Sequence, residues 1–392
     1  MGIKRFSFLL GIALGCIIAI SSCNSSSDER HIQALADQLD ILVHETEPAD
    51  TVLIPHSINE DGTLNCRKRE WWTSGFFPGS LWYMYELTGD EYWAGEATLH
   101  TEILDSVQFC TKHHDVGFIM QCSYGNGLRL KGREQYKDIL IQTARSLSTR
   151  YRPAAGVIQS WRAHRGWLCP VIIDNMMNLE LLFEASLMSG DESFRNIAIT
   201  HADNTIRNHF RPDGSSFHVV DYDPETGEVR QRCTAQGYND DSSWSRGQAW
   251  GLYGFTVCYR YTSDPKYLEQ AEKIAAFIFS NPNLPEDLVP YWDYDAPEIP
   301  NEPCDASAAA ITASGLYELY GFTGNKDYLK KADKIMESLG SSAYLCAPGT
   351  RHGFLLDHCV TNKRGGSDVD KPLVYADYYY LEALVRRRGI KK

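Results

Sequence analysis

The sequence has little positive charge and no basic cluster before its last seven residues, which read RRRGIKK. Its 392 residues include 38 Lys and Arg against 51 Asp and Glu, which gives a formal net charge of −13. A protein that binds nucleic acid needs a basic surface for the phosphate backbone, so we expect no nucleic-acid partner. An anionic ligand would need local cations, because the overall field of the chain repels it.

Paired cysteines and metal-binding motifs are also missing. The eleven Cys include no C-x-x-C pair, and setting aside Cys16 and Cys23 near the N-terminus leaves nine. An odd number at scattered positions does not suit a disulfide framework, so we expect most of these side chains to be buried as small apolar groups. His113 and His114 precede Asp115, but no H-E-x-x-H motif or second ligand group accompanies them. The sequence therefore predicts no metal and no other cofactor.

The N-terminal apolar run is too short to indicate a membrane span. Phe6–Ile20 follows Lys4 and Arg5 and has the length of a signal-peptide core. The ISSC that follows resembles the lipobox of bacterial lipoproteins, in which Cys23 would be lipidated; the alternative is an ordinary cleaved signal with an incidental cysteine. We expect an exported protein of a bacterial periplasm or cell envelope, held at the membrane by a lipid anchor alone.

These signals divide the chain into three parts. Residues 1–22 would be the signal peptide, residues 23–30 a polar tether, and residues 31–392 one folded domain. With 43% hydrophobic and 23% charged residues, the chain has the composition of a globular protein that buries a large core.

Alternating strand patterns are few, whereas a helix-to-helix corner recurs. Each corner has an apolar helix end, a small residue and a polar pair; the small residues are Gly89, Gly132, Gly190, Ser263 and Gly324. A glycine there supplies a left-handed C-cap, and the Asp or Asn that often follows can cap the next helix. The corners are 43, 58, 73 and 61 residues apart, which is enough for an inner and an outer helix each time.

The corners predict an all-α fold built as a closed ring of helical hairpins, with functional loops at one mouth. An open solenoid is the alternative, but the unequal spacing and the long loops speak against it. SFHVVDYD and GEVRQRC read as two strands that pair across DPETG. We therefore expect a minor β-hairpin in the loops.

Aromatic residues are abundant, with nine Trp and 22 Tyr. Flat aromatic faces suit sugar rings, so carbohydrate binding is one interpretation; the other is that these side chains pack the core of a helical ring, which is the better interpretation for any single Trp. Six of them lie near Gly, Pro, Asp or Asn, where loops meet helices: Trp71, Trp72, Trp161, Trp167, Trp244 and Trp250.

Two carboxylates are candidates for chemistry. Asp174 follows an apolar run and begins a predicted helix, where an Asp often serves only as an N-cap. Asp115 precedes a Gly, where a turn-forming Asp is equally ordinary. A pair of carboxylates that converge on a sugar can serve glycoside chemistry, because one stays protonated while the other stays ionised.

Seven segments carry a family resemblance. In order, they read WTSGFFPGSLW, HHDVGF, IIDNMMNLELL, DGSSFHVVDYDPETGEV, WSRGQAWGLYGF, DASAAAITASGLYEL and YADYYYLEALVR. Together they resemble glycoside hydrolase family 88, the unsaturated glucuronyl hydrolases, over nearly the whole chain after the leader. The resemblance implies an (α/α)6 barrel. It also implies an enzyme that removes the 4,5-unsaturated uronic acid from the non-reducing end of lyase-generated glycosaminoglycan oligosaccharides, by hydrating the C4=C5 vinyl ether.

The resemblance also implies roles for individual residues. Asp174 would be the general acid and base, and Asp115 would position the sugar ring or tune Asp174. The substrate-binding residues that it implies are His114, His218, Gln236, Arg246, Trp250, Trp161 and Trp72, the last three as aromatic walls. For Arg246, the alternative is a buried ion pair with Asp240 or Asp241.

Two other functions compete with this one. Unsaturated rhamnogalacturonyl hydrolases, which act on pectin fragments, typically have W-x-R-G-N-G-W where this chain has Gln248 and Ala249, which favours the glucuronyl type. A non-catalytic glycan-binding lipoprotein would not need both candidate carboxylates.

The sequence also bears on the choice of glycosaminoglycan. Some family members carry an S-x-x-S-x-K segment that resembles a sulfate site, and here the region reads CVTNKRGGSDVDKPL instead. Lys363 and Arg364 supply cations there, but the missing pattern favours heparin-type fragments over chondroitin-type fragments with a 6-sulfated galactosamine.

Overall fold

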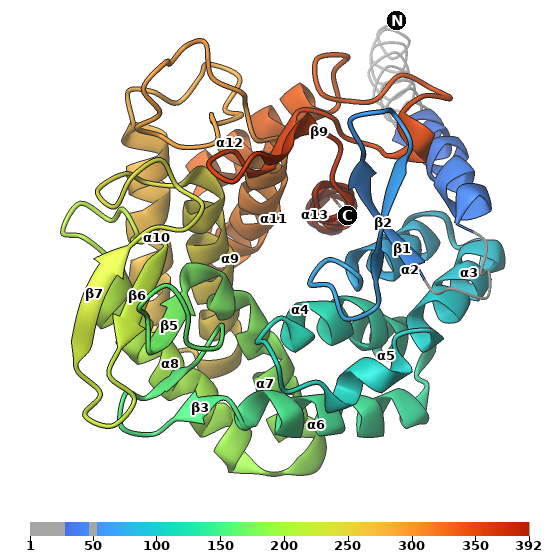
Figure 1. Ribbon diagram of the computed structural model, residues 1–392. Helices are drawn as coiled ribbons and strands as arrows, with labels where there is room; N and C mark the ends of the chain where they lie inside the picture. The colour runs from blue at the N-terminus through green and yellow to red at the C-terminus, as the bar shows by residue number, and fades with distance from the viewer. Residues whose placement is uncertain (1–27, 47–52, 392) are drawn as a thin grey trace, which may run out of the picture.

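The computed structural model describes residues 28–46 and 53–391 (Figure 1). The predicted signal peptide and the lipidation site Cys23 lie outside these residues. Residues 28–45 form a helix, so residues 28–30 belong to a helix rather than to the predicted tether.

The helices form two layers around a ring, and the chain runs once around it from blue to red (Figure 1). The inner layer consists of α2 (Phe76–Thr88), the segment α4 (Val116–Met120), η2 (Gln121–Gly125) and α5 (Asn126–Lys131), η3 (Ile173–Asn178) with α7 (Leu179–Ser189), α9 (Ser245–Thr262), α11 (Ala306–Thr323) and α13 (Val374–Lys391). The outer layer consists of α3 (Glu91–Glu102), α6 (Glu134–Ser148), α8 (Glu192–His209), α10 (Pro265–Ser280), α12 (Lys326–Leu339) and the helix over residues 28–45. Two short 3-10 segments complete the set, η1 (Asp105–Phe109) and η4 (Arg351–Gly353).

The ring is closed. Helix α13 contacts both α11 and α2, α9 contacts α11 and α7, and α4 contacts α7, while η2 and α5 contact α2. This confirms the predicted closed ring over the open solenoid. Helices α9 and α11 are almost wholly buried, whereas α6, α10 and α12 bury one face and expose the other, as inner and outer helices should.

All five predicted corners are present as left-handed C-caps. Their φ angles lie between 54° and 75°, at Gly89, Gly132, Gly190, Ser263 and Gly324. At four of the corners the next residue caps the following helix with its side chain: Asp90, Asp191, Asp264 and Asn325. At the corner after α5 the N-cap is Arg133, which makes no side-chain cap. At four of the five corners, a side-chain cap therefore satisfies one N–H group at the start of the next helix.

Four small antiparallel sheets lie in the loops. Three are hairpins, which pair β1 (Leu53–Ile58) with β2 (Leu64–Lys68), β3 (Tyr151–Arg152) with β4 (Val157–Ile158), and β8 (Cys359–Asn362) with β9 (Ser367–Lys371). In the fourth, β6 (Val219–Tyr222) lies between β5 (Cys169–Ile172) and β7 (Val229–Cys233) and pairs with both. The predicted pairing of β6 with β7 is confirmed. The structure adds β5 to that hairpin and contains three further hairpins that the sequence analysis missed.

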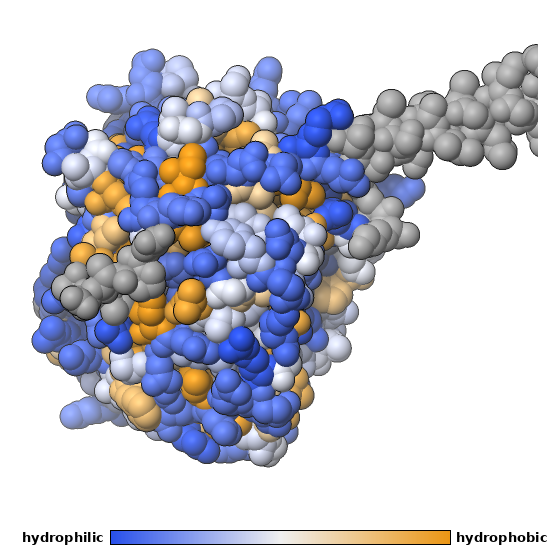
Figure 2. Space-filling view, turned by 90° about the vertical axis from the view of Figure 1, so that its right-hand side faces the viewer, coloured by the Kyte–Doolittle hydropathy of each residue, from blue (hydrophilic) through white to orange (hydrophobic). Residues whose placement is uncertain are grey.

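The surface on the side of α3 is mostly hydrophilic, with scattered apolar patches (Figure 2). Within residues 28–46 and 53–391, no helix combines the length and the apolar composition needed to cross a membrane. The nine cysteines in these ranges are free, and six of them are buried, as predicted for small apolar side chains.

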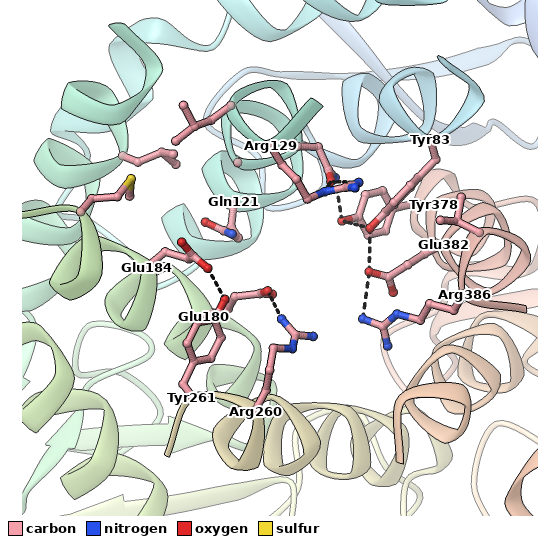
Figure 3. A pocket seen from close by; sticks show the side chains of 16 residues that line it. Tyr83, Gln121, Arg129, Glu180, Glu184, Arg260, Tyr261, Tyr378, Glu382 and Arg386 are labelled. Carbon is pink, nitrogen blue, oxygen red and sulfur yellow. Dashed lines mark hydrogen bonds and ion pairs between the residues drawn. The ribbon is translucent and has the colours of Figure 1, made fainter. Parts of the chain in front are cut away.

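A network of charged side chains connects the inner helices toward their C-terminal ends, around a cavity of about 490 Å³ (Figure 3). Arg260 on α9 contacts Glu180 on α7 and Glu318 on α11. Arg386 on α13 contacts Glu318 and Glu382, and Glu382 accepts a hydrogen bond from Tyr83 on α2. We interpret this network as structural, because its carboxylates and guanidinium groups pair with one another.

Candidate active site

The β5–β6–β7 sheet brings three predicted site residues together at one end of its strands. Asp174 lies two residues after β5, His218 immediately before β6, and Gln236 three residues after β7. The antiparallel register pairs Val219 with the last residue of β5 and with the last residue of β7. The end of β5, the start of β6 and the end of β7 therefore lie side by side.

Backbone groups fix the His218 ring. The N–H groups of Ala235 and Gln236 both donate to Nδ1 of His218, each at 3.1 Å. Burial and the nearby Arg246 charge lower the pKa of His218 to about 3, so the ring is neutral at physiological pH. Since Nδ1 accepts hydrogen bonds, the single ring proton lies on Nε2, which is 3.6 Å from Oδ2 of Asp174.

Asp174 is a buried carboxyl group that can hold a proton near neutral pH. Its exposure is 8%, and its Oδ2 has no hydrogen-bond partner among the described residues. Burial raises the pKa of Asp174 to about 6, and the positive charge of Arg246 limits the rise. The N-cap alternative is not what the structure contains, because Ile172 occupies the N-cap position of η3, and this cap has no side-chain hydrogen bond.

Asp115 has the opposite electrostatic environment. One of its oxygens lies 3.2 Å from Nδ1 of His113, and the other lies 3.2 Å from Nε2 of His114. Burial alone would raise the pKa of Asp115, but the two imidazoles hold it far below its usual range. Burial alone would lower the pKa of His113, but its contact with Asp115 raises the pKa of the imidazole to about 10. The site thus pairs an ionised carboxylate with a protonatable one.

Asn178 sets the orientation of His114. Its Oδ1 accepts a hydrogen bond from the Phe118 N–H at 3.0 Å, which leaves Nδ2 to donate to Nδ1 of His114 at 3.2 Å. The His114 proton therefore lies on Nε2 and faces Asp115. Gly117 permits this close packing, because a Cβ at that position would lie 2.4 Å from Oδ1 of Asn178. His114 is fully buried, so it positions Asp115 rather than contacting a ligand as predicted.

Arg246 is a buried charge beneath the site. Its exposure is 1%, and it forms an ion pair with Asp305 at 3.0 Å, not with Asp240 or Asp241. Its guanidinium also donates to the carbonyl groups of Val360 and Thr361, and it lies over the Trp244 and Tyr375 rings. Most of its donors are therefore occupied by the protein. The structure makes Arg246 a fixed charge that tunes Asp174, which differs from the predicted direct contact with a ligand.

The three predicted aromatic walls differ in exposure. Trp72 and Trp161 are partly exposed, and Trp161 lies edge-on to His218 with 6.2 Å between the ring centroids. Trp250 has 0% exposure and packs against Phe118 at 5.3 Å, so it belongs to the core. Its place one turn inside α9 directs it into the ring, and its predicted contact with the substrate stays a prediction.

A cavity of about 650 Å³ opens beside these residues. Its lining includes His113 from the Asp115 side, Trp161 from the loop after β4, and Gln236 from the loop after β7. Gln236 is held by a hydrogen bond from Nε2 to the Thr361 carbonyl at 2.9 Å. The cavity is thus lined by side chains that contact Asp115 and His218, although neither Asp115 nor Asp174 is itself part of its lining.

The profile of glycosyl hydrolase family 88 matches residues 50–293. An unsaturated glucuronyl hydrolase of Formosa agariphila is 48% identical over 321 residues, which cover 81% of this chain and 80% of that protein. The chain belongs to glycosyl hydrolase family 88. It is 34% identical to an unsaturated chondroitin disaccharide hydrolase of Streptococcus agalactiae, over 80% of this chain and 81% of that one. A crystal structure of an unsaturated glucuronyl hydrolase specific for heparin superposes with a TM-score of 0.89 at 44% identity, covering 93% of this chain and 98% of that chain.

Membership of family 88 confirms that the chain is a glycoside hydrolase with the predicted ring fold.

The residues that sequence reasoning missed are those that hold the predicted site residues in place. Asp305 and Asn178 both lie inside the quoted motifs, but neither showed a partner, since Arg246 is 59 residues from Asp305 and His114 is 64 residues from Asn178. His113 was considered only as a metal ligand. In the parts of the chain that the structure describes, no group of three or more His, Cys, Asp and Glu side chains could hold a metal ion.

Proposed function

We propose that this family 88 hydrolase removes a 4,5-unsaturated uronic acid from the non-reducing end of glycosaminoglycan oligosaccharides, with Asp174 as the general acid and base. The observation that carries the proposal is a buried carboxyl group, with a pKa of about 6, whose Oδ2 lies 3.6 Å from the Nε2 of neutral His218. A general acid acts best when its pKa is near the working pH, and Asp174 meets that condition.

The reaction is the hydration of a vinyl ether. Asp174 donates its proton to C4, the C4=C5 electron pair forms the new C–H bond, and positive charge develops at C5 next to the ring oxygen. Ionised Asp115 stabilises this charge across the ring. Water then adds at C5 and gives its proton to Asp174, with His218 Nε2–H as a donor that orients the water oxygen. The resulting hemiketal opens and releases the rest of the oligosaccharide. No displacement at the anomeric carbon is needed. The distance between the two carboxylates therefore does not decide between retention and inversion at that carbon, as it does in other glycoside hydrolases.

The helix arrangement supports an anionic substrate. Each inner helix begins beside a site residue: α2 after Trp72, α4 after Asp115, η3 at Asp174, α9 at Arg246, α11 after Asp305 and α13 at Tyr375. Helix N-termini carry partial positive charge and unpaired N–H groups. This local positive field, together with the charge of Arg246, favours binding of a uronate carboxylate despite the overall negative charge of the chain.

Heparin-type fragments are the favoured substrates. A structural relative at 44% identity is described as specific for heparin, and the chain lacks the S-x-x-S-x-K pattern. The relative at 34% identity is described as acting on chondroitin disaccharides. Lys363, one of the two cations predicted near this region, contacts the buried Glu302 and is therefore not free for a ligand.

The test is the absorbance of the unsaturated uronate during incubation of the mature protein with lyase-derived disaccharides. Heparin-type, chondroitin-type and pectin-derived disaccharides are assayed separately. We expect loss of absorbance with the glycosaminoglycan disaccharides and faster loss with the heparin type. Loss with the pectin-derived disaccharide alone would support a rhamnogalacturonyl hydrolase instead, and loss with none would exclude the proposed activity.

We propose further that the enzyme is a lipoprotein of the bacterial cell envelope, anchored through Cys23. The ISSC segment after the apolar run Phe6–Ile20 supports this anchor. Cys23→Ser should move the protein from the membrane fraction to the soluble fraction in a bacterial host that lipidates proteins. An unchanged distribution would rule out this anchor.

A further inference from the structure

Cys110 is a partly exposed cysteine whose sulfur contacts a histidine. It lies at the end of η1, in the loop that leads to α4, whereas six of the nine described cysteines are buried. The side chains of Phe109 and Thr111, on either side of it, are exposed, so this part of the loop lies at the protein surface. Its Sγ is 3.5 Å from Nε2 of His113.

His113 connects this sulfur to Asp115. The Nδ1 atom of the same ring lies 3.2 Å from Oδ2 of Asp115, so one ring nitrogen faces a carboxylate and the other faces the sulfur. An imidazole between two acceptors is stabilised in its doubly protonated form. A nucleophile, a histidine beside it and a third group that orients the histidine together form the arrangement that activates catalytic Ser and Cys side chains. We call these three residues the Cys110 triad.

The charges around the sulfur favour a thiolate. Arg150 is 6% exposed and donates to the carbonyl groups of Thr111, Gln159 and Ser160, so its positive charge lies beside the Cys110 loop. Burial alone would raise the pKa of the Cys110 thiol, but contacts with His113 and with the loop backbone lower it below its usual range. Because the pKa of His113 is about 10, the pair exists as thiolate and imidazolium at neutral pH.

We infer that Cys110 is a modification site, where hydrogen peroxide oxidises the thiolate and thereby inactivates the enzyme. The Sγ atom attacks one peroxide oxygen, and an S–O bond forms as the O–O bond breaks, which gives a sulfenic acid. The second oxygen leaves as hydroxide and takes the proton from Nε2 of His113 to form water. The sulfur loses two electrons and the peroxide gains them, so the step needs no other reactant.

The effect on catalysis passes through His113. Oxidation removes the negative charge on the sulfur, adds an oxygen atom beside the ring and takes a proton from it. The neutral ring no longer supplies the positive charge that holds the carboxylate of Asp115. This part of the inference rests on the proposed function, in which ionised Asp115 stabilises the charge at C5. A displacement of about 1 Å at such a group can reduce the rate by about 100-fold.

The first experiment measures the alkylation of each cysteine by iodoacetamide at pH 7, using mass spectrometry of the peptides and no substrate. Cys66 and Cys304 are internal controls, because they are also partly exposed and burial raises the pKa of both thiols. We expect Cys110 to react at least about tenfold faster than either one. An ordinary thiol is only about 3% thiolate at this pH, although a thiolate of low pKa is also a weaker nucleophile.

A variant of the histidine tests the triad itself. His113→Gln should lower the alkylation rate of Cys110 by about tenfold and leave the rate of Cys66 unchanged, because the imidazolium charge is lost. The matched control is His164→Gln. His164 lines the same cavity as His113 and is also partly exposed, but it contacts Trp161. The control should leave the alkylation rate of Cys110 unchanged.

The second experiment treats the protein with hydrogen peroxide and then measures turnover by uronate absorbance. Turnover of the native protein should fall by about tenfold or more, a sulfenic acid at Cys110 should be trapped by dimedone, and a thiol reductant should restore turnover. Cys110→Ser should turn over substrate and keep its rate after peroxide treatment. The serine hydroxyl can accept a hydrogen bond from His113, but it is not oxidised.

Three results would overturn the inference. Equal alkylation rates at the three partly exposed cysteines would exclude an activated thiolate. An unchanged rate at Cys110 in His113→Gln would exclude the triad. Equal losses of turnover in the native protein and in Cys110→Ser would show that peroxide acts at another residue. Absence of turnover with every disaccharide before treatment would remove the proposed function and the inactivation with it, whereas the alkylation rates would still decide the state of the thiol.

Discussion

Nε2 of His218 lies 3.6 Å from Oδ2 of Asp174, and neither atom forms a hydrogen bond with the described residues. Buried polar atoms without partners are costly, and at an enzyme site they mark positions that a substrate or water occupies. The imidazole cannot turn away, because two backbone N–H groups hold its Nδ1. The two groups that we propose as the proton donor to C4 and as the donor to the attacking water therefore lie side by side.

Replacing Asp174 with Asn removes the proton donor and keeps the size of the side chain. We expect kcat to fall by about 10³-fold, within the range that general acids supply, while substrate binding changes little. Turnover is measured by uronate absorbance, and binding is measured by calorimetry with the inactive variant. Asp138→Asn on the outer helix α6 is the matched control and should behave as the native enzyme. Near-normal turnover of Asp174→Asn would exclude Asp174 as the acid.

The pH dependence of kcat/KM should follow Asp174. Because its pKa is raised to about 6, the acid form is lost above that pH, and kcat/KM should then fall tenfold per unit. The same limb should not come from His218 or Asp115, whose pKa values are both lowered. A profile that stays flat up to pH 8 would contradict this assignment.

The same carboxyl group should reduce the stability of the fold as the pH rises above about 4. Its pKa in the folded protein, about 6, is higher than the ordinary value of about 3.9. Below pH 4 both states are protonated, so the group has no effect; as pH rises from about 4 to about 6, the unfolded state ionises first and the free energy of unfolding falls. The loss is complete above pH 6 and amounts to about 2–3 kcal/mol.

Asp174→Asn cannot ionise, so it should unfold at a higher Tm than the native enzyme at pH 8 and at a similar Tm at pH 4. Thermal unfolding at the two pH values measures this difference. Equal stabilisation at both pH values would show that the effect is not due to the carboxylate charge.

Asp305→Asn should destabilise the fold, because it leaves the buried Arg246 charge without its partner. Both side chains have exposures of 1% or less, and breaking such a pair costs about 3–5 kcal/mol. The amide can still accept the Ser307 N–H that caps α11, so the change tests the charge more than the cap. Glu60→Gln, which removes an exposed partner of Lys371, is the control and should cost under about 1 kcal/mol in urea unfolding. Equal effects of the two changes would contradict the role of the buried pair.

The corners of the ring could be predicted because they depend on local chemistry. A left-handed residue such as Gly190 and a capping residue such as Asp191 fix the end of one helix and the start of the next within a few positions. The strands β1, β3 and β8 were not recognised; β3 has only two residues, which carry no alternation that could distinguish a strand from a loop.

The site was predictable to the extent that its residues share one motif or one hairpin. Pairing of β6 with β7 places His218 near Gln236, and both strands were recognised. The roles of Arg246 and Trp250 depended on tertiary packing instead. Arg246 finds its counter-charge 59 residues away, and Trp250 meets Phe118 from another helix. Sequence spacing places these two side chains on one helix face but does not decide whether the face meets a ligand or the core.

The most direct test of the account is the position of deuterium in the product when the reaction runs in D₂O. Proton NMR at early times, before the released keto acid exchanges with solvent, reads the label. Protonation of C4 by the fixed carboxyl group of Asp174 predicts one deuterium at C4 in a single diastereotopic position. An equal mixture of the two positions would show that C4 is protonated in free solution after displacement at the anomeric carbon, which would contradict hydration by Asp174.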